Sequence, residues 1–492
     1  MKARSRPPHA AGVARRRQWG DVDPCPRAGP RAGRAPRTLV RPVLLLAGVL
    51  GLLACAVSWV DFRPNRLVQG EGRTLAALGL PLWWGLPLAW AALLACGWLA
   101  ARWQRVFAPL LYVATAYGVS HLLGAAATTL VSEDNPFARV SPAAGLWLSV
   151  AALYVAGFAV SRVWRPVGLA GALAFVLPPL LGGWNTLGLV QEYRNVADTF
   201  WPQLGTHAAL SVIALVLAAL LGLPLGIAAA RSERLAGGVL GFASFLQTVP
   251  SVALFGLLLP VFSALGRGVS VGTFLAWSGG ALLLGLGLTR LRRLAPLGGP
   301  VGGLLALLGG QALLLLAGLG LLQVVQGAWL GGDGLSRDAF SLSAPLGAWG
   351  VRGIGAAPAL LALTLYALLP IVVNTFVGLR GVPPGIPDAA RGLGMTPAQV
   401  LWRAELPVAL PYVFEGLRSA LVLTFGIATI AALIGAGGLG FFIQRGVEGN
   451  VPDLVLLGAL PIVLIALLLS EGLRRLGGWL TPKGLRAGEN PV

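Results

Sequence analysis

Charged residues are scarce in this sequence, and lysine is scarcer still. Only 11% of the 492 residues are charged and 56% are hydrophobic, whereas about a quarter of the residues of a soluble domain are charged. This composition excludes a water-soluble globular protein. Neither lysine, Lys2 or Lys483, follows a glycine, so the sequence has no phosphate-binding loop of the form G-x-x-x-x-G-K-[ST]. An ATPase of that type is therefore excluded as well.

Residues that commonly bind metals or catalyse reactions are also few. The three cysteines, Cys25, Cys55 and Cys96, have neither metal-like nor disulfide-like spacing, and the three histidines form no H-E-x-x-H motif. Within the apolar stretches His121 is the clearest ionisable residue, and we expect it to be neutral and hydrogen-bonded. The sequence thus predicts a protein that is not an enzyme, with no catalytic residues, no cofactor and no metal site.

Apolar runs of about 20 residues are abundant, and each could cross a bilayer core of roughly 30 Å as a helix. They predict an all-α polytopic membrane protein with about twelve transmembrane helices. The expected spans are 43–60, 75–100, 106–131, 143–163, 166–183, 206–230, 236–262, 270–289, 300–326, 356–379, 413–437 and 454–471.

The net charge of +19 is better explained by membrane topology than by nucleic-acid binding, because the arginines lie between apolar runs. With the N-terminus inside and the spans alternating, 28 of the 37 Lys and Arg residues fall on the cytoplasmic side, as the positive-inside rule requires. Both termini are then cytoplasmic, and residues 327–352 form an external loop.

The two ends of the chain differ from its apolar middle. Residues 1–41 contain eleven basic residues and six prolines, a composition typical of disorder, and predict a disordered cytoplasmic tail. Residues 42–183 hold the first five spans, a membrane region to which the sequence assigns no role. A second cytoplasmic tail is expected at 473–492.

One cytoplasmic connection, residues 380–412, is longer than the others and has its own helix signals. Pro387 is a favourable first residue for a short helix that continues to Arg391. Gly392 and Gly394 supply its end, because glycine readily adopts the left-handed conformation that closes a helix.

A second short helix is predicted immediately afterwards. Thr396 and Gln399 have the spacing of a capping box, with Pro397 in the first turn and Pro407 at the end. The two helices would bend across the glycines at the membrane face. Such a loop is suited to docking a partner protein, although an amphipathic hairpin without a partner would have the same signals.

The sequence of this loop, DAARGLGMTPAQVLWRAELP, resembles the loop signature of inner-membrane permease subunits of binding-protein-dependent ABC importers. That signature reads Glu-Ala-Ala, three residues, Gly, nine residues, Ile, one residue and Leu-Pro. An aspartate replaces the glutamate, and Ala404 replaces the isoleucine. The corresponding positions are Asp388, Ala389, Ala390, Gly394, Leu406 and Pro407.

Flanking segments resemble the osmoprotectant branch of that family, whose members move glycine betaine, choline and related compounds. The similar segments are 233–260, 353–375 and the GAGGLG run at 435–440. The resemblance implies a five-helix core of a type I ABC importer permease within 204–472, interrupted by a two-helix insertion at 266–352.

The resemblance also implies how such a protein works. The loop, including Gly392, would seat in a groove of a separate ABC ATPase subunit and transmit its closure to the membrane helices. Small Ala389 and Ala390 would permit close approach, and Asp388 would be favoured at a helix N-terminus. The other implied partners are a periplasmic or extracellular solute-binding protein, a second permease subunit, identical or related, and membrane lipid, but no nucleic acid. The implied location is the bacterial inner membrane.

The translocation path is expected where prolines and small polar residues interrupt the spans, because broken backbone at membrane depth is tolerated beside protein or a wet cavity. Gln247, Thr248, Pro250 and Ser251 interrupt the seventh span, and Asn374 lies late in the tenth. These residues could instead form hydrogen bonds between helices, and both explanations fit the sequence.

Two other classes of protein fit parts of the pattern. A twelve-helix secondary transporter has the right number of spans, but its two halves would place the long cytoplasmic loop between spans six and seven, where only a few residues lie. An intramembrane enzyme would need an acidic or metal-binding cluster at one membrane face, whereas Asp333 and Asp338 lie in a Gly- and Ser-rich segment without partners.

Overall fold

A computed structural model gives the fold of residues 40–481, except 67, 132–134, 136, 163, 165, 291–297 and 330–336. The predicted tail at 1–41 lies outside the described residues apart from its last two, which begin the first helix. Of the predicted tail at 473–492, residues 473–480 continue the last helix and the rest after 481 is outside the described part.

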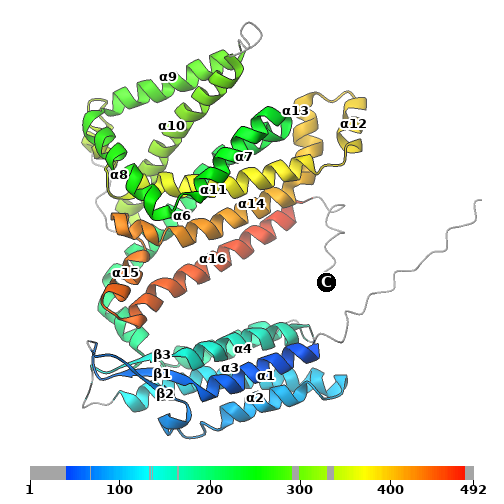
Figure 1. The fold of residues 1–492 in the computed structure, drawn as a ribbon, viewed down its shortest axis with the longest axis vertical. Coiled ribbons are helices and arrows are strands. Elements are labelled where there is room, and N and C mark those ends of the chain that lie inside the picture. Colours follow the sequence, from blue (N-terminus) through cyan, green and yellow to red (C-terminus); the bar gives the residue numbers. More distant parts are fainter. Residues whose placement is uncertain are drawn as a thin grey trace, which may run out of the picture.

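Residues 40–187 form a first group of helices, called the N-terminal bundle here (Figure 1). One continuous cluster of buried apolar side chains fills it. Glycines allow close packing, since a Cβ added at Gly51 on the first helix would overlap the ring of the buried Trp90 on the second. The helices are α1 (Val40–Ala56), α2 (Gly85–Cys96), α3 (Ala101–Leu130), α4 (Ala144–Ser161) and α5 (Val167–Leu180).

A small antiparallel sheet, not expected in an all-α protein, lies at one end of this bundle. Its strands are β1 (Ser58–Arg63), β2 (Glu71–Thr74) and β3 (Arg139–Pro142), in the order β2-β1-β3. The predicted span 43–60 therefore ends at Ala56, and the apolar run continues because Trp59 and Val60 are buried strand residues.

Residues 188–481 form the second group, called the core here. Its apolar side chains fall into three separate buried clusters. The helices are α6 (Gly188–Arg231), α7 (Glu233–Thr248), α8 (Ser251–Gly268), α9 (Val271–Arg290), α10 (Gly298–Trp329), α11 (Ala356–Arg380), α12 (Gly385–Gly392), α13 (Pro397–Val400), α14 (Leu406–Ile427), α15 (Gly440–Glu448) and α16 (Pro452–Leu480).

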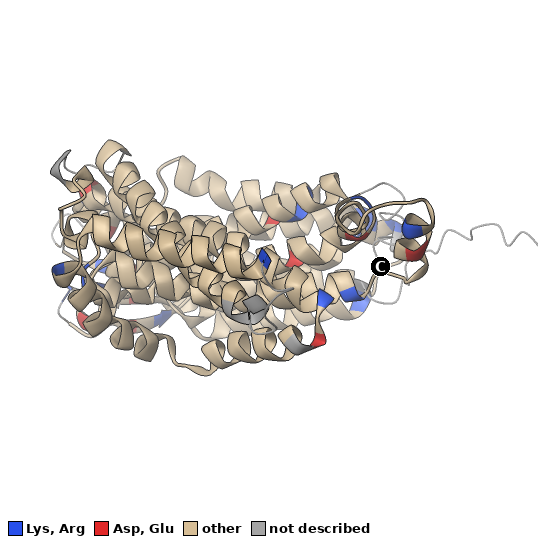
Figure 2. Ribbon diagram, turned by 90° about the horizontal axis from the view of Figure 1, so that it is seen from above, with Lys and Arg blue, Asp and Glu red and all other residues tan. Residues whose placement is uncertain are grey.

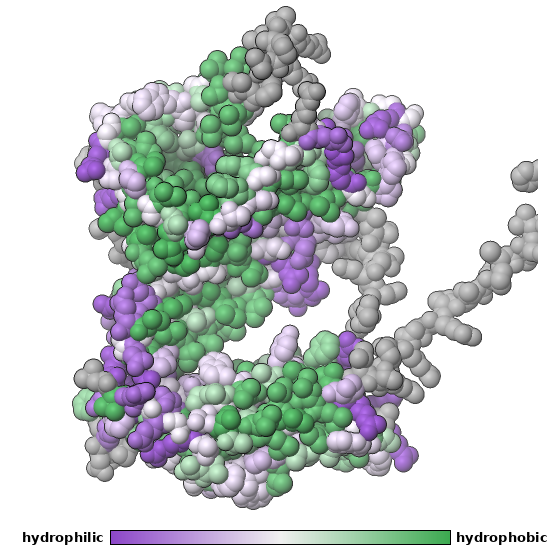
Figure 3. Space-filling model, viewed as in Figure 1, coloured by the Kyte–Doolittle hydropathy of each residue, from purple (hydrophilic) through white to green (hydrophobic). Residues whose placement is uncertain are grey.

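The chain is an all-α membrane protein apart from the small sheet. Among the described residues, nine helices are long and apolar enough to span a membrane, and broad apolar surfaces cover the face seen in Figure 3. Within the described part of the chain, fewer helices than the twelve predicted are long enough to span a membrane. The 12 residues of α2 cover only about 18 Å at 1.5 Å per residue, and the predicted span 236–262 is divided between α7 and α8.

The long helices run in similar directions, so that their ends define two sides of the molecule. The start of α1, the end of α16 and the α12–α13 segment lie at the same side, whereas the sheet and α15 lie at the other (Figure 1). Charged residues gather toward these two sides and leave an uncharged band between them (Figure 2). This distribution is the one expected of a protein in a bilayer.

The bundle and the core meet at the side of the sheet through buried charged residues (Figure 1). Glu192 on α6 is fully buried and forms ion pairs with Arg66 and Arg139. Asp453 in the first turn of α16 is buried as well, and Ser141 Oγ donates a hydrogen bond to its Oδ2 at 2.6 Å. Because buried charges need partners, these contacts bind the two groups to each other.

Candidate functional site

The segment after α11 has the bent shape that its glycines predict. Helix α12 begins at Gly385, two residues before the predicted Pro387. Asp388 lies in its first turn and accepts a hydrogen bond from Arg391 Nη1 at 2.8 Å. Gly394 has a φ of +79°, which a residue with a side chain adopts only at a cost, so this glycine is required for the bend between α12 and α13.

The alanines and glycines of the loop have different surroundings. Ala390 is buried, whereas Ala389 is exposed. A Cβ added at Gly392 or Gly394 would meet no atom within 4 Å. Only one of the two alanines therefore packs inward, and the rest of the turn is open to a partner.

The predicted capping box is confirmed, but the predicted helix end is wrong. Thr396 N donates to Gln399 Oε1 at 2.9 Å, and Gln399 N donates back to Thr396 Oγ1 at 3.4 Å. The chain does not stop at Pro407. It passes through a π-helical turn, Leu401–Glu405, directly into α14. A wider π-turn moves the local hydrogen bonds by one residue, so Leu406 and Pro407 open α14, where a proline needs no amide partner.

Ion pairs join the base of this loop to two other helices. Arg231, at the end of α6, pairs with Glu405, which is largely buried. Arg380 Nη1, at the end of α11, lies 3.8 Å from Glu233 Oε1, at the start of α7. A displacement of the loop would therefore be carried to α6, α7, α11 and α14 together.

Two large apolar side chains of the loop are exposed, although the loop lies outside the uncharged band between the two sides of the molecule. Leu393 is 79% and Trp402 62% exposed. Exposed apolar groups among polar neighbours are typical of a protein interface. Together with the open glycines they make the segment 381–405 a candidate docking site.

The four residues that interrupt the seventh predicted span lie together at a helix break. Gln247 and Thr248 end α7, while Pro250 caps and Ser251 begins α8. Tyr366 Oη on α11 donates to the carbonyl of Val249 at 2.5 Å. The break is thus a defined structure, fixed to α11 by a hydrogen bond.

Asn374 does not join this group. Its Nδ2 donates to the carbonyl of Pro370 within α11 at 2.8 Å. A Cβ added at Gly416 would lie 2.8 Å from the Cβ of Asn374, so Asn374 packs against α14. The structure therefore brings four of the five predicted path residues together and leaves the fifth between two other helices.

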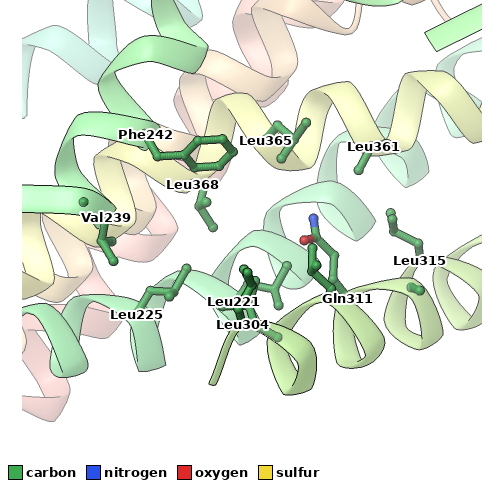
Figure 4. A pocket seen from close by; sticks show the side chains of 14 residues that line it. Leu221, Leu225, Val239, Phe242, Leu304, Gln311, Leu315, Leu361, Leu365 and Leu368 are labelled. Carbon is green, nitrogen blue, oxygen red and sulfur yellow. The ribbon is translucent and has the colours of Figure 1, made fainter. Parts of the chain in front are cut away.

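A separate cavity of about 560 Å³ lies between α6, α7, α10 and α11, and none of the five predicted path residues lines it. Its walls are apolar, with leucines and Phe242 facing one another across it (Figure 4). Among the described residues, Gln311 on α10 is the one lining residue with a polar side chain, and it points toward α11. Such a cavity suits an apolar group better than a charged solute.

The buried histidine is not the one that the sequence suggests. His121 is exposed, and its ring stacks on Tyr117 with centroids 5.5 Å apart. Among the described residues its side chain has no hydrogen bond, so the predicted hydrogen bond of His121 is wrong, while its predicted neutral state stays a prediction. His207 on α6 is buried instead, and its Nε2 lies 3.2 Å from the carbonyl of Phe425. Sequence position alone gives no signal for this, since both histidines lie in apolar runs.

His207 lies beside the GAGGLG run, which forms an irregular connection between α14 and α15. Gly435, Gly437 and Gly438 all have positive φ. Gly438 N donates to Gln203 Oε1 on α6 at 2.6 Å. The glycines thus allow the chain to turn sharply against α6, a second break in the helices of the core.

Two parts of the sequence match described protein families. Residues 37–190 match the N-terminal domain of the ABC transporter permease YehY. Residues 222–483 match the family described as the inner membrane component of binding-protein-dependent transport systems. The first match falls on the bundle and the second on most of the core.

Similar proteins have known transport roles. The osmoprotectant import permease protein OsmW of Salmonella typhimurium is 34% identical over 280 residues, which are 57% of this chain and 91% of that protein. The glycine betaine/carnitine/choline transport system permease protein OpuCB of Bacillus subtilis is 25% identical over 282 residues, 57% of this chain and 88% of that protein. A solved structure of the MetNI methionine ABC transporter is 17% identical and aligns with a TM-score of 0.36 over 56% of this chain and 94% of that one.

The second family match extends over more than half of the chain. It includes the loop with the capping box, the helix break and the GAGGLG connection. The chain therefore belongs to the permeases of binding-protein-dependent ABC transport systems.

Proposed function

We propose that this permease imports small osmoprotectants, such as glycine betaine, choline or carnitine, with energy from ATP hydrolysis in a partner subunit. The observation that carries the proposal is the 34% identity to an osmoprotectant import permease along 91% of that protein. The other partners are an external solute-binding protein and a second permease subunit. A proton-driven secondary transporter is disfavoured, because its long loop would lie at a different place in the chain.

The loop between α11 and α14 is proposed to couple the permease to the ATPase. Its exposed Leu393 and Trp402 would contact the ATPase, and the Arg231–Glu405 pair would carry the movement to α6. The residues assigned to this loop are Asp388, Ala389, Ala390, Gly392, Gly394, Leu406 and Pro407.

The translocation path is proposed to run along the α7–α8 break and past Asn374, between two permease subunits. The proposed lining residues are Gln247, Thr248, Pro250, Ser251 and Asn374. They are polar but uncharged, so they would bind a solute weakly and release it easily. High affinity for a quaternary ammonium group would reside in the binding protein, where aromatic faces can stabilise the cation.

The proposed topology has twelve crossings with both termini in the cytoplasm, and α7 with α8 makes one crossing. The proposed organisation has an N-terminal membrane region at 42–183 and a permease core at 204–472 with an insertion at 266–352. Reporter fusions after Arg391 and after Gly449 test it. We expect the first to be cytoplasmic and the second external, and the reverse result would contradict the topology.

Uptake into vesicles tests the function. Vesicles that contain the permease, its ATPase and its binding protein should accumulate labelled glycine betaine, choline or carnitine when ATP is inside. Uptake that persists without ATP or without the binding protein would overturn the importer mechanism. ATP-driven uptake of an unrelated solute alone would overturn the substrate class.

A further inference from the structure

A pocket of about 610 Å³ lies where the bundle meets the core, at the side opposite the α12–α13 loop. Arg66 lines it from the bundle, Asn195 from α6, and Phe442, Arg445 and Glu448 from α15. The pocket is large enough for a small organic molecule. It therefore combines two guanidinium groups, a carboxylate and an amide in one space.

Structural contacts hold these side chains in place. Arg66 forms an ion pair with the fully buried Glu192, which fixes one edge of its guanidinium. The guanidinium carbon of Arg445 lies 4.6 Å from the centre of the Phe441 ring. In the described ranges of the chain, Arg445 has no ion pair and its guanidinium donates no hydrogen bond. Its N–H groups are therefore available to a ligand.

A break in α6 shapes the third wall. Val196, which lines the pocket, has φ −125° and ψ 16°, outside the helical range, although the helix continues on both sides. The side chain of the neighbouring Asn195 has no hydrogen bond within the described part of the chain. The kink therefore presents an unused amide group at the pocket.

We propose that this pocket binds a small zwitterion, a molecule that carries one carboxylate and one cationic group. The carboxylate would lie between Arg66 and Arg445, because guanidinium groups bind carboxylates through paired hydrogen bonds. The cationic group would lie against the carboxylate of Glu448. A simple anion would leave the carboxylate of Glu448 without a cationic partner, and a simple cation would leave the guanidinium of Arg445 without an anionic one, whereas a zwitterion supplies both partners.

The site requires both parts of the chain. Arg66 belongs to the region that matches the YehY N-terminal domain, and Arg445 to the region that matches the permease family. A ligand held between them would stabilise the docked arrangement by RT ln(1 + [L]/Kd), so the stabilisation would grow with the logarithm of the ligand concentration once the site is occupied. The N-terminal bundle thereby gains a role as one half of a binding site separate from the translocation path.

Binding to the isolated full-length permease in lipid nanodiscs, without ATPase or binding protein, tests this proposal. The probes are glycine betaine, choline, which lacks the carboxylate, and acetate, which lacks the cation; binding is measured by calorimetry. Glycine betaine should bind more tightly than either. The choice of glycine betaine as probe rests on the proposed function, but the ligand class rests on the pocket.

Variants then assign the binding to the pocket. Arg445→Gln should weaken binding of glycine betaine about tenfold or more, as expected when a charged hydrogen-bond donor is lost. Glu448→Gln should weaken binding of glycine betaine and leave acetate unchanged or tighter. The matched control is Arg162→Gln, since Arg162 stacks in the same way on Phe158, 4.8 Å away and also four residues earlier, at the other side of the bundle.

Several results would overturn the proposal: no binding of glycine betaine by the permease, equal binding of choline, or equal affinity in Arg445→Gln and Arg162→Gln. Thermal unfolding of each variant shows whether it is folded, and Glu448→Gln provides a second test if Arg445→Gln is not. Weakened binding with normal ATP-driven uptake would leave the proposed function intact. Absent uptake with normal binding would count against the proposed function and not against this site.

Discussion

The N-terminal bundle and the core are both built from apolar helices, but they are packed differently. The bundle has one continuous cluster of buried side chains, whereas the core has three clusters. Side chains that interlock in one cluster resist relative movement. The buried side chains of the core are instead divided into neighbouring clusters along α6 and α11, and both helices contribute to all three clusters.

The helices of the core also contain interruptions. They are the α7–α8 break, the π-turn at Leu401–Glu405 and the GAGGLG connection. Specific contacts hold two of them, from Tyr366 to Val249 and from Gly438 to Gln203. Each of these two contacts therefore gives its break a defined conformation.

The largest effect on uptake is expected when the proposed coupling between the ATPase and the core is disturbed. Gly394→Val places a side chain at φ +79°, at a cost of about 1–2 kcal/mol. Relief of this strain would reorient α12, and ATP-driven uptake should fall by roughly tenfold while the bundle stays folded. Uptake by vesicles and thermal unfolding measure the two effects.

Gly472→Val is the matched control, because Gly472 lies within α16, outside the loop, and a Cβ added there would meet no atom within 4 Å. It should transport nearly as well as the unaltered chain. Equal uptake by both variants would mean that the bend at Gly394 does not transmit movement from the ATPase to the core. It would then contradict the proposal that the core, and not the bundle, is coupled to the ATPase.

A smaller effect on uptake is expected at the contact between the bundle and the core. Glu192→Gln removes a buried charge with two arginine partners, a change that costs about 3 kcal/mol. Undocking of the bundle should make the exposed Arg194 more accessible to trypsin, measured as the rate of cleavage. Glu471→Gln is the control, since Glu471 also pairs with two arginines but its side chain, on α16, is only partly buried. Cleavage that is equally fast in both variants would contradict the account of the junction.

The smallest effect is expected at one hydrogen bond. Tyr366→Phe removes the donor to the Val249 carbonyl, worth about 1 kcal/mol, so the melting temperature and the uptake rate should fall modestly. Tyr112→Phe in the bundle should change neither, because the Tyr112 hydroxyl has no hydrogen bond among the described residues. If Tyr112→Phe has the larger effect, the hydrogen bond from Tyr366 does not stabilise the α7–α8 break.

Local signals in the sequence predicted the loop best. The Thr396–Gln399 capping box depends on residues three positions apart, and it is present with both hydrogen bonds. Pro407 was assigned to a helix end because proline usually interrupts a helix, but the π-turn before it avoids the clash. A change in helix type depends on the packing of α14 and leaves no pattern in the sequence.

Contacts between residues that are far apart in the chain could not be predicted from the sequence. Glu192 meets Arg66 and Arg139 across 126 and 53 residues, and Ser141 meets Asp453 across 312. In the sequence, each of these residues is one polar residue among others between the predicted spans, and no local pattern indicates its partner. The short strands β1 and β3 were missed for the same reason, because only their pairing makes them strands.

The central claim is that the ATPase subunit binds to the core and not to the bundle. Its most direct test is cross-linking from single cysteines, in a chain whose native cysteines are replaced, to the ATPase in assembled vesicles. The positions are Leu393, 79% exposed in the loop, and Trp98, 57% exposed at the same side of the bundle. A cross-link from position 393 and none from position 98 is predicted. A cross-link from position 98 alone would contradict the claim.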